Sequence, residues 1–223
     1  MASLSRSLAR WAAGLRFRDL PAQVVDRARG VTLQAISSAL LGSQTEDGRR
    51  AIALITEEEA GVRAGATILV SGARATKGGA AFANAEMALA GGKWDTFRML
   101  THPGTSIIPA ALAAAEANNA SGRDFLVGVA AGYEVMERLA SDFIPTVMSR
   151  GFHAGPVFGI FGAAVAAAKI MGLGEEQLNS AIALCASLAS GNLEGPPLRG
   201  PSRVALVNPL PILPSSTNTS PGI

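Results

Sequence analysis

The sequence predicts an all-α domain, and three observations support this fold class. Hydrophobic residues make up 48% of the 223 residues, but aromatic residues make up only 5%, and much of the apolar content is alanine. Alanine is the best helix former, so this composition favours packed helices over a sheet. Only one stretch, ATILVSG at 66–72, has the apolar, glycine-bounded pattern of a strand. The length suffices for one domain with a substantial core.

The expected helices follow one another along the chain. A first helix is indicated by apolar residues at helical spacing, namely Leu4, Leu8, Trp11 and Leu15. Asp19 and Pro21 open a second helix, which Gly42 should end as the glycine just past the last turn. Pro109 could start a helix after an irregular loop at 93–106. The remaining helices are expected at 51–61, 76–92, 107–119, 122–141, 155–172 and 175–190.

The last 28 residues, 196–223, differ from this pattern because they hold seven of the chain's twelve prolines. Proline lacks a backbone donor and is excluded from helix interiors. We therefore expect a helical domain over 1–195 followed by an extended or disordered proline-rich tail over 196–223. A proline-rich ligand motif is the alternative interpretation of this tail.

Charge and cysteine content narrow the function classes. The formal net charge is +2, and no run of Lys and Arg alternates with aromatic residues, so no nucleic-acid partner is expected. The single cysteine, Cys185, excludes an intramolecular disulfide and fits a reducing, cytoplasmic location. Its apolar surroundings favour a buried, inert thiol over a nucleophile.

Two segments allow a targeting or membrane interpretation. The first eighteen residues carry arginines and serines without an acid, as in transit peptides, although their helical spacing favours a packed helix. Residues 151–168 carry no formal charge and contain Gly155 and Gly159 at the spacing of a helix-pairing motif. Because this stretch is mainly Ala and Gly and is barely long enough to span a bilayer, we expect a buried core helix and no membrane partner.

The only two histidines, His102 and His153, occur in matching contexts. Each lies in a Gly- or Pro-broken loop directly before an alanine-rich helix. A helix N-terminus attracts anions, and an imidazole moves protons near neutral pH. If the two loops face one cavity, they would form a proton-transferring site for a carboxylate.

Several segments in this order resemble the MmgE/PrpD family. They are WAAGLRFRDLPAQVVDRAR, GGAAFANAEMA, DTFRMLTHPGTSIIPAALAAAE, GRDFLVGVAAGYEVMERL, RGFHAGPVFGIFGAAVAAAKIMGL and ASLASGNLEG. The family includes 2-methylcitrate dehydratase, cis-aconitate decarboxylase and iminodisuccinate epimerase. The resemblance implies a large helical domain, a smaller α/β lid domain, a homodimer, no cofactor in most members, and small di- or tricarboxylate substrates. A 2-methylcitrate dehydratase-like lyase of propionate metabolism is therefore expected.

The resemblance also assigns site residues. Asp95 and Thr96 match the end of the family's Asp-Asp-Thr loop, His102 matches its HP histidine, and His153 matches its GFH histidine. We expect His102, His153 and Asp95 to be catalytic and Thr96 and Gly104 to bind substrate, with no metal. A solvated loop carboxylate for Asp95 and a helix or turn cap for Thr96 are the structural alternatives.

Three departures from the family pattern leave the activity open. Gly92 stands where an active-site Asp is expected, and a glycine side chain cannot carry a proton. No lysine follows Lys169, although the family has a substrate-binding lysine there. The lid and its following helices are also absent from this chain, as a frameshift or truncation would explain. A lyase, active or impaired, and a catalytically silent helical module that dimerises both stay open.

Overall fold

The computed structural model describes residues 3–63, 65–98 and 101–191, and it confirms the all-α prediction. Within these residues the chain forms nine α-helices, one 3-10 turn (η1, Phe17–Asp19) and a two-stranded hairpin. The helices are α1 (Leu4–Gly14), α2 (Ala22–Gly42), α3 (Glu46–Glu58), α4 (Lys77–Ala90), α5 (Gly104–Ala117), α6 (Gly122–Ala140), α7 (Ile144–Ser149), α8 (Ala154–Ile170) and α9 (Glu175–Leu188). The strands β1 (Ala66–Thr67) and β2 (Arg74–Ala75) pair antiparallel. The expected tail at 196–223 lies outside the described residues.

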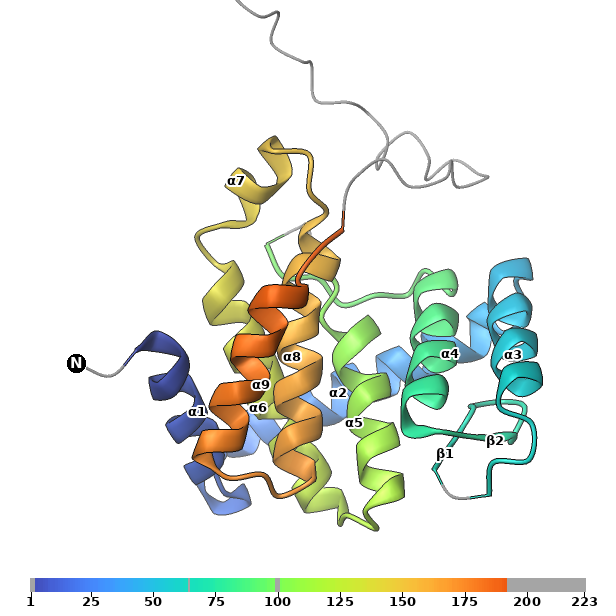
Figure 1. Ribbon diagram of the computed structural model, residues 1–223, viewed down its shortest axis with the longest axis horizontal. Helices are drawn as coiled ribbons and strands as arrows, with labels where there is room; N and C mark the ends of the chain where they lie inside the picture. The colour runs from blue at the N-terminus through green and yellow to red at the C-terminus, as the bar shows by residue number, and fades with distance from the viewer. Residues whose placement is uncertain (1–2, 64, 99–100, 192–223) are drawn as a thin grey trace, which may run out of the picture.

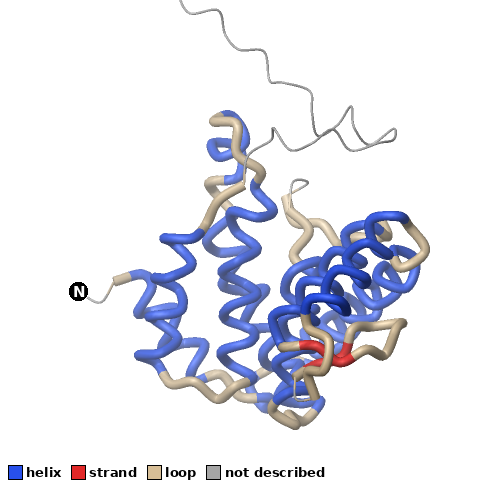
Figure 2. The backbone as a smooth tube through the Cα atoms, turned by 45° about the vertical axis from the view of Figure 1, so that its right-hand side comes forward, coloured by secondary structure: helices blue, strands red, loops and turns tan. Residues whose placement is uncertain are grey.

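The helices pack side by side around α8, which contacts α5, α6 and α9 (Figure 1). The N-terminal helix α1 lies against α9 at one end of the molecule, and α3, α4 and the hairpin form the other end (Figure 1). The short helix α7 projects above the body at the end where α8 begins (Figure 1). A second view shows the hairpin at the edge of the helical body (Figure 2). Residues 151–168, weighed above as a membrane span, are mostly the central helix α8, and no described helix is long and apolar enough to cross a bilayer.

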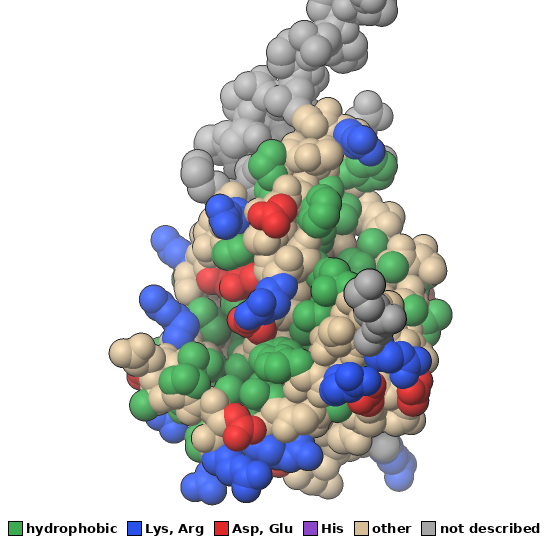
Figure 3. Space-filling view, turned by 90° about the vertical axis from the view of Figure 1, so that its left-hand side faces the viewer, with side chains coloured by type: hydrophobic (Ala, Val, Ile, Leu, Met, Phe, Trp, Pro, Cys, Tyr) green, Lys and Arg blue, Asp and Glu red, His purple; other side chains and the backbone are tan. Residues whose placement is uncertain are grey.

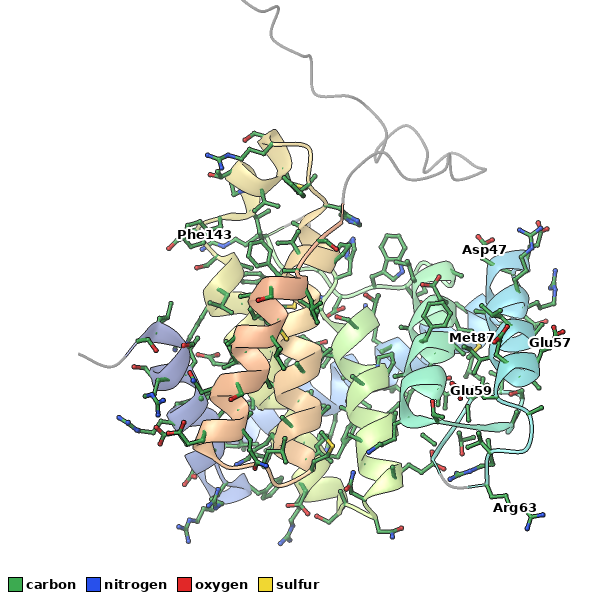
Figure 4. The ribbon with its side chains drawn as sticks, in the orientation of Figure 1. Asp47, Glu57, Glu59, Arg63, Met87 and Phe143 are labelled. Atoms are coloured by element: carbon green, nitrogen blue, oxygen red, sulfur yellow. The ribbon has the colours of Figure 1, made fainter. Side chains whose placement is uncertain are left out.

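Buried apolar side chains form three clusters between these helices. One lies between α2, α5, α6 and α8, a second joins α1, α6, α8 and α9, and a third covers the hairpin with α4. Met87 belongs to the third cluster, is fully buried and points from α4 toward α3 (Figure 4). Phe143, just before α7, is 59% exposed (Figure 4). Cys185 is buried as predicted, and burial raises the pKa of its thiol.

Charged side chains tie the first and last described helices together at the surface. Arg10 on α1 forms an ion pair with Glu175 on α9 at 3.1 Å, and Arg6 pairs with Glu176. On the face at the α1 end of the molecule, basic and acidic side chains lie side by side among apolar ones (Figure 3). Such exposed pairs contribute about 0–1 kcal/mol each. The apolar clusters therefore supply most of the folding free energy.

Local capping explains where several helices begin. Ser121 accepts the backbone N–H of Asp124, and the Asp124 carboxylate reaches back to the Ser121 N–H, so α6 starts with a capping box as its SGRD sequence predicts. At α9, the Gln177 side chain accepts the N–H of Gly174. Thr45 caps α3 by accepting the Gly48 N–H, so α3 begins at Glu46 instead of the expected residue 51.

The structure contradicts the predicted roles of Gly42 and Pro109. Gly42 is the last residue of α2 and not the glycine beyond it, and a Cβ there would collide with the Met87 carbonyl oxygen on α4. Its role is close helix packing. Pro109 does not start a helix but lies inside α5, which already begins at Gly104, where the carboxylate of Asp95 in the preceding loop accepts the Gly104 N–H. The expected strand at 66–72 is likewise shorter, with only Ala66–Thr67 paired.

Candidate functional site

The loop that precedes α5 folds back on itself and returns His102 to the side of Asp95. Phe97 and Thr101 form an antiparallel bridge in which each N–H donates to the other residue's carbonyl, at 3.0 and 3.3 Å. The Thr101 hydroxyl also donates to the Phe97 carbonyl at 2.9 Å, and Thr101 is fully buried. The bridge closes the loop and so sets the position of the residue that follows it, His102.

His102 is half-buried, and the loop determines which of its nitrogens carries the proton. Its Nδ1 lies 2.9 Å from the backbone carbonyl oxygen of Asp95 and 3.4 Å from the Thr96 hydroxyl. Because a carbonyl oxygen only accepts, Nδ1 must be the protonated nitrogen in the neutral ring. The Trp94 ring packs against the imidazole with centroids 4.5 Å apart. Nε2 is therefore the nitrogen left to exchange a proton.

His153 lies at the N-terminal end of the central helix. It is the residue that caps α8, its side chain makes no capping bond, and its backbone N–H donates to the Gly191 carbonyl at 3.0 Å. Burial, followed by the nearby positive charge of His102, lowers the pKa of His153 below its ordinary value. The imidazole is thus neutral at neutral pH, as a general base must be.

The structure brings the two histidine loops together at the N-terminal ends of α5 and α8. These helices pack against each other, and a Cβ placed on Gly159 of α8 would lie 2.9 Å from the Ser106 hydroxyl of α5. The positive charge of His102 adds to burial in lowering the pKa of His153. Their catalytic roles stay predictions.

Asp95 uses its carboxylate to anchor α5. Its two oxygens accept the N–H of Gly104, the first residue of the helix, at 2.9 and 3.1 Å, and Oδ2 also accepts the Tyr133 hydroxyl at 2.7 Å. A Cβ on Gly104 would lie 2.8 Å from the Asp95 carboxylate, so the close contact requires glycine. The Asp95 carboxylate and the Gly104 N–H are therefore bound to each other in this structure. If Asp95 is catalytic or Gly104 binds substrate, it does so while keeping these hydrogen bonds or by exchanging them for substrate.

A cavity of about 700 Å³ lies between α2, α6 and the 94–97 loop. Asp95 and Thr96 are among its lining residues, but neither histidine is. Its charged lining residues are one base, Arg27, and three acids, Asp95, Glu134 and Glu137. Burial, and then the charges of Glu134 and Asp95, raise the pKa of Glu137 to about 7. This negative lining repels a di- or tricarboxylate, so the histidine side of the loop suits such a substrate better.

The structure adds residues that the sequence analysis did not single out. Trp94 contacts His102, Gly191 contacts His153, and Tyr133 holds Asp95. Burial and the Asp95 carboxylate raise the pKa of Tyr133 well above its ordinary value, so its hydroxyl stays a donor. One signal was available, since Tyr133 is the only tyrosine in the sequence and directly follows an apolar stretch, 125–132. The contacts of Trp94 and Gly191 join segments that no local pattern connects.

The structure also bears on Gly92 and on metal binding. Gly92 follows α4 with a φ of +69°, is exposed, and a Cβ there would meet nothing within 4 Å. In the part of the chain that the structure describes, no three His, Cys, Asp or Glu side chains are grouped to hold a metal ion.

Comparison with known proteins identifies the family of this chain. The family description "MmgE/PrpD N-terminal domain" matches residues 6–196, which include every candidate site residue. The chain belongs to the MmgE/PrpD family. The cis-aconitate decarboxylase-like protein oryM of Aspergillus oryzae is 30% identical over 199 residues, covering 85% of this chain and 41% of that protein. The cis-aconitate decarboxylase of Homo sapiens is 28% identical over 200 residues, covering 84% of this chain and 40% of the relative. The enzyme of the same name from Aspergillus terreus is 23% identical over 197 residues, covering 84% and 39%.

The present chain thus spans about two fifths of the length of the curated relatives that it matches. Membership of the MmgE/PrpD family relates it to lyases, because these relatives are named as decarboxylases or decarboxylase-like proteins.

Proposed function

We propose that this protein is a lyase of small di- or tricarboxylates in which His102 and His153 transfer protons. The observation that carries the proposal is that both histidines directly precede or cap the N-terminal ends of two packed helices, α5 and α8. The first turn of α8 leaves the N–H groups of Ala154 and Gly155 without intrahelical acceptors, and these can bind a substrate carboxylate.

The two imidazoles suit either of two lyase reactions. In a dehydration, neutral His153 would take the proton from the carbon next to a carboxylate and the C–O bond would break. The leaving hydroxide would take the Nε2 proton of a His102 protonated on both nitrogens, so that water departs and His102 is left with its Nδ1 proton. In a decarboxylation, the C–C bond to the leaving carboxylate would break and CO2 would depart. The remaining electron pair would delocalise as an enolate into a neighbouring carboxylate, and a protonated imidazole would then protonate the carbon.

The relatives favour one substrate for the first assay. Three of them carry cis-aconitate decarboxylase in their names, so we propose cis-aconitate ahead of 2-methylcitrate. We further propose a homodimer in the cytoplasm. The cytoplasmic location is supported by the single, buried cysteine, since it needs no oxidising compartment.

The test is turnover by the purified chain and by one variant. We expect the chain to consume cis-aconitate, followed by NMR of substrate and product, and His153→Ala to lower the rate by about 10²–10⁴-fold because it removes the base. Asp142→Asn, a change in an exposed residue outside the site, should keep the full rate. Turnover no faster than that of His153→Ala would refute catalysis by this chain.

A helical module that dimerises without catalysis is the second candidate function, and Gly92 favours it. This residue stands where the family resemblance expects an aspartate, so one proton-carrying group is missing. A stable dimer in sedimentation velocity together with no turnover would support this function, whereas histidine-dependent turnover would eliminate it.

A further inference from the structure

The segment that follows α9 crosses the N-terminal end of α8 and touches His153. Helix α9 ends at Leu188, and the Ala189 N–H still donates to the Cys185 carbonyl at 2.7 Å. Two residues later, the Gly191 carbonyl accepts the His153 backbone N–H at 3.0 Å. The last turn of α9 is itself held against α8, where Cys185 is buried. The packing of α9 thus determines where the Gly191 carbonyl lies.

Gly191 fits this place because it has no side chain. Its φ is +132°, a backbone conformation that residues with a Cβ rarely adopt. A Cβ there would also lie 2.9 Å from both Cβ and Cγ of Pro156, in the first turn of α8. The backbone of Gly191 is therefore in direct contact with the Pro156 ring while it accepts the His153 N–H.

The contact matters for His153 because the backbone N–H of this residue has no acceptor within its own helix. As the capping residue it accepts the Val157 N–H at its carbonyl, at 3.3 Å, but its own N–H lies outside the helical ladder and its side chain forms no capping bond. The His153 N–H needs a hydrogen-bond acceptor, and the Gly191 carbonyl, in the segment that follows α9, supplies it. The Gly191 bond thus fixes the backbone from which the imidazole extends.

We propose that Gly191 is a positioning residue for His153, holding it at the start of α8 through the Gly191 carbonyl and the close contact with Pro156. The inference rests on the proposed function, in which His153 transfers a proton. It adds the α9–α8 connection to the parts of the fold that form the site.

The experiment compares Gly191→Ala with Gly172→Ala by NMR without substrate. Gly172 also has a positive φ, +73°, but lies just beyond the opposite end of α8, and a Cβ there meets nothing within 4 Å. Both variants strain a left-handed backbone, so they separate positioning of His153 from a general loss of stability. With only two histidines in the sequence, His102→Gln assigns the two imidazole signals.

We expect the His153 amide to be protected from hydrogen exchange in the unmodified protein and to exchange at least about tenfold faster in Gly191→Ala. The titration of the His153 ring should move up toward its ordinary pKa in Gly191→Ala, because the displaced ring loses burial and its proximity to His102. Gly172→Ala should change neither quantity.

Two results would overturn the proposal. One is an unprotected His153 amide in the unmodified protein, which tests the contact even if Gly191→Ala fails to fold. The other is a titration of His153 that moves equally in both variants or in neither. Since neither measurement uses a substrate, a chain without turnover would refute the proposed function and leave this test intact.

Discussion

At the scale of single residues, Asp95 connects three parts of the site. Its carboxylate holds the start of α5 and the Tyr133 hydroxyl of α6, while its backbone carbonyl orients His102. We expect Asp95→Asn to lower the free energy of unfolding by about 1.5–3 kcal/mol, because hydrogen bonds to a charged acceptor are lost and an amide NH2 replaces one oxygen. Urea unfolding measures this change, with Asp142→Asn as the exposed control. Equal stability of the two variants would show that the Asp95 bonds contribute little.

Gly92 tests a different residue-scale question, namely whether the missing carboxylate limits the activity. Its φ of +69° lies in the left-handed region that Asp tolerates better than most residues, and the space around it is open. We expect Gly92→Asp to fold with a cost of about 1 kcal/mol and to raise the rate of lyase turnover. Gly92→Asn, with the same shape and no carboxylate, is the matched control. A rate gain shared by both variants would argue against an acid–base role.

At the scale of elements, the packing of α2 against α4 depends on Gly42. A Cβ at this position would strike the Met87 carbonyl, and backbone cannot move aside as a side chain can. We expect Gly42→Ala to destabilise the fold by about 1–3 kcal/mol through overpacking.

The same helix supplies the control. Gly30 lies in the middle of α2, where a Cβ would meet nothing within 4 Å. Gly30→Ala should stabilise the protein by about 0.5–1 kcal/mol, because alanine loses less backbone entropy in a helix. Thermal unfolding measures the change in melting temperature of each variant. The two changes have opposite signs if the close approach of α4 requires glycine at position 42, and the same sign if helix propensity alone acts at both positions.

At the scale of the whole molecule, Glu137 makes folding stability depend on pH. Its pKa in the folded protein is raised to about 7 from an ordinary 4.5, so the folded state holds this proton more tightly than the unfolded state. The contribution of Glu137 to the free energy of unfolding therefore falls as pH rises from about 4.5 to 7 and stays low above 7.

Replacing Glu137 with glutamine removes this penalty. We expect Glu137→Gln to raise the melting temperature at pH 8 relative to the unmodified protein, with a smaller difference at pH 5, where Glu137 is largely protonated in the folded state. Glu57→Gln on α3, at an exposed acid, should show no such pH trend. A constant difference for Glu137→Gln across this range would contradict the raised pKa.

The sequence alone predicts the helical elements because each is encoded locally. Alanine content, apolar spacing and capping residues such as Ser121 with Asp124 act within one or two turns, so α1, α2, α4, α6, α8 and α9 begin and end near their predicted limits. The sequence alone also indicates the resemblance to the MmgE/PrpD family. It likewise shows that each histidine directly precedes an expected helix.

Only the tertiary structure decides which groups share a site and which are already bound. The Asp95 carboxylate holds Tyr133, the Gly191 carbonyl holds His153, and Gly42 contacts α4, all across separations that no short sequence window spans. The physical reason is that a helix start is a local property of the chain. The partner that satisfies its N–H groups comes from whichever distant segment the packed core brings close.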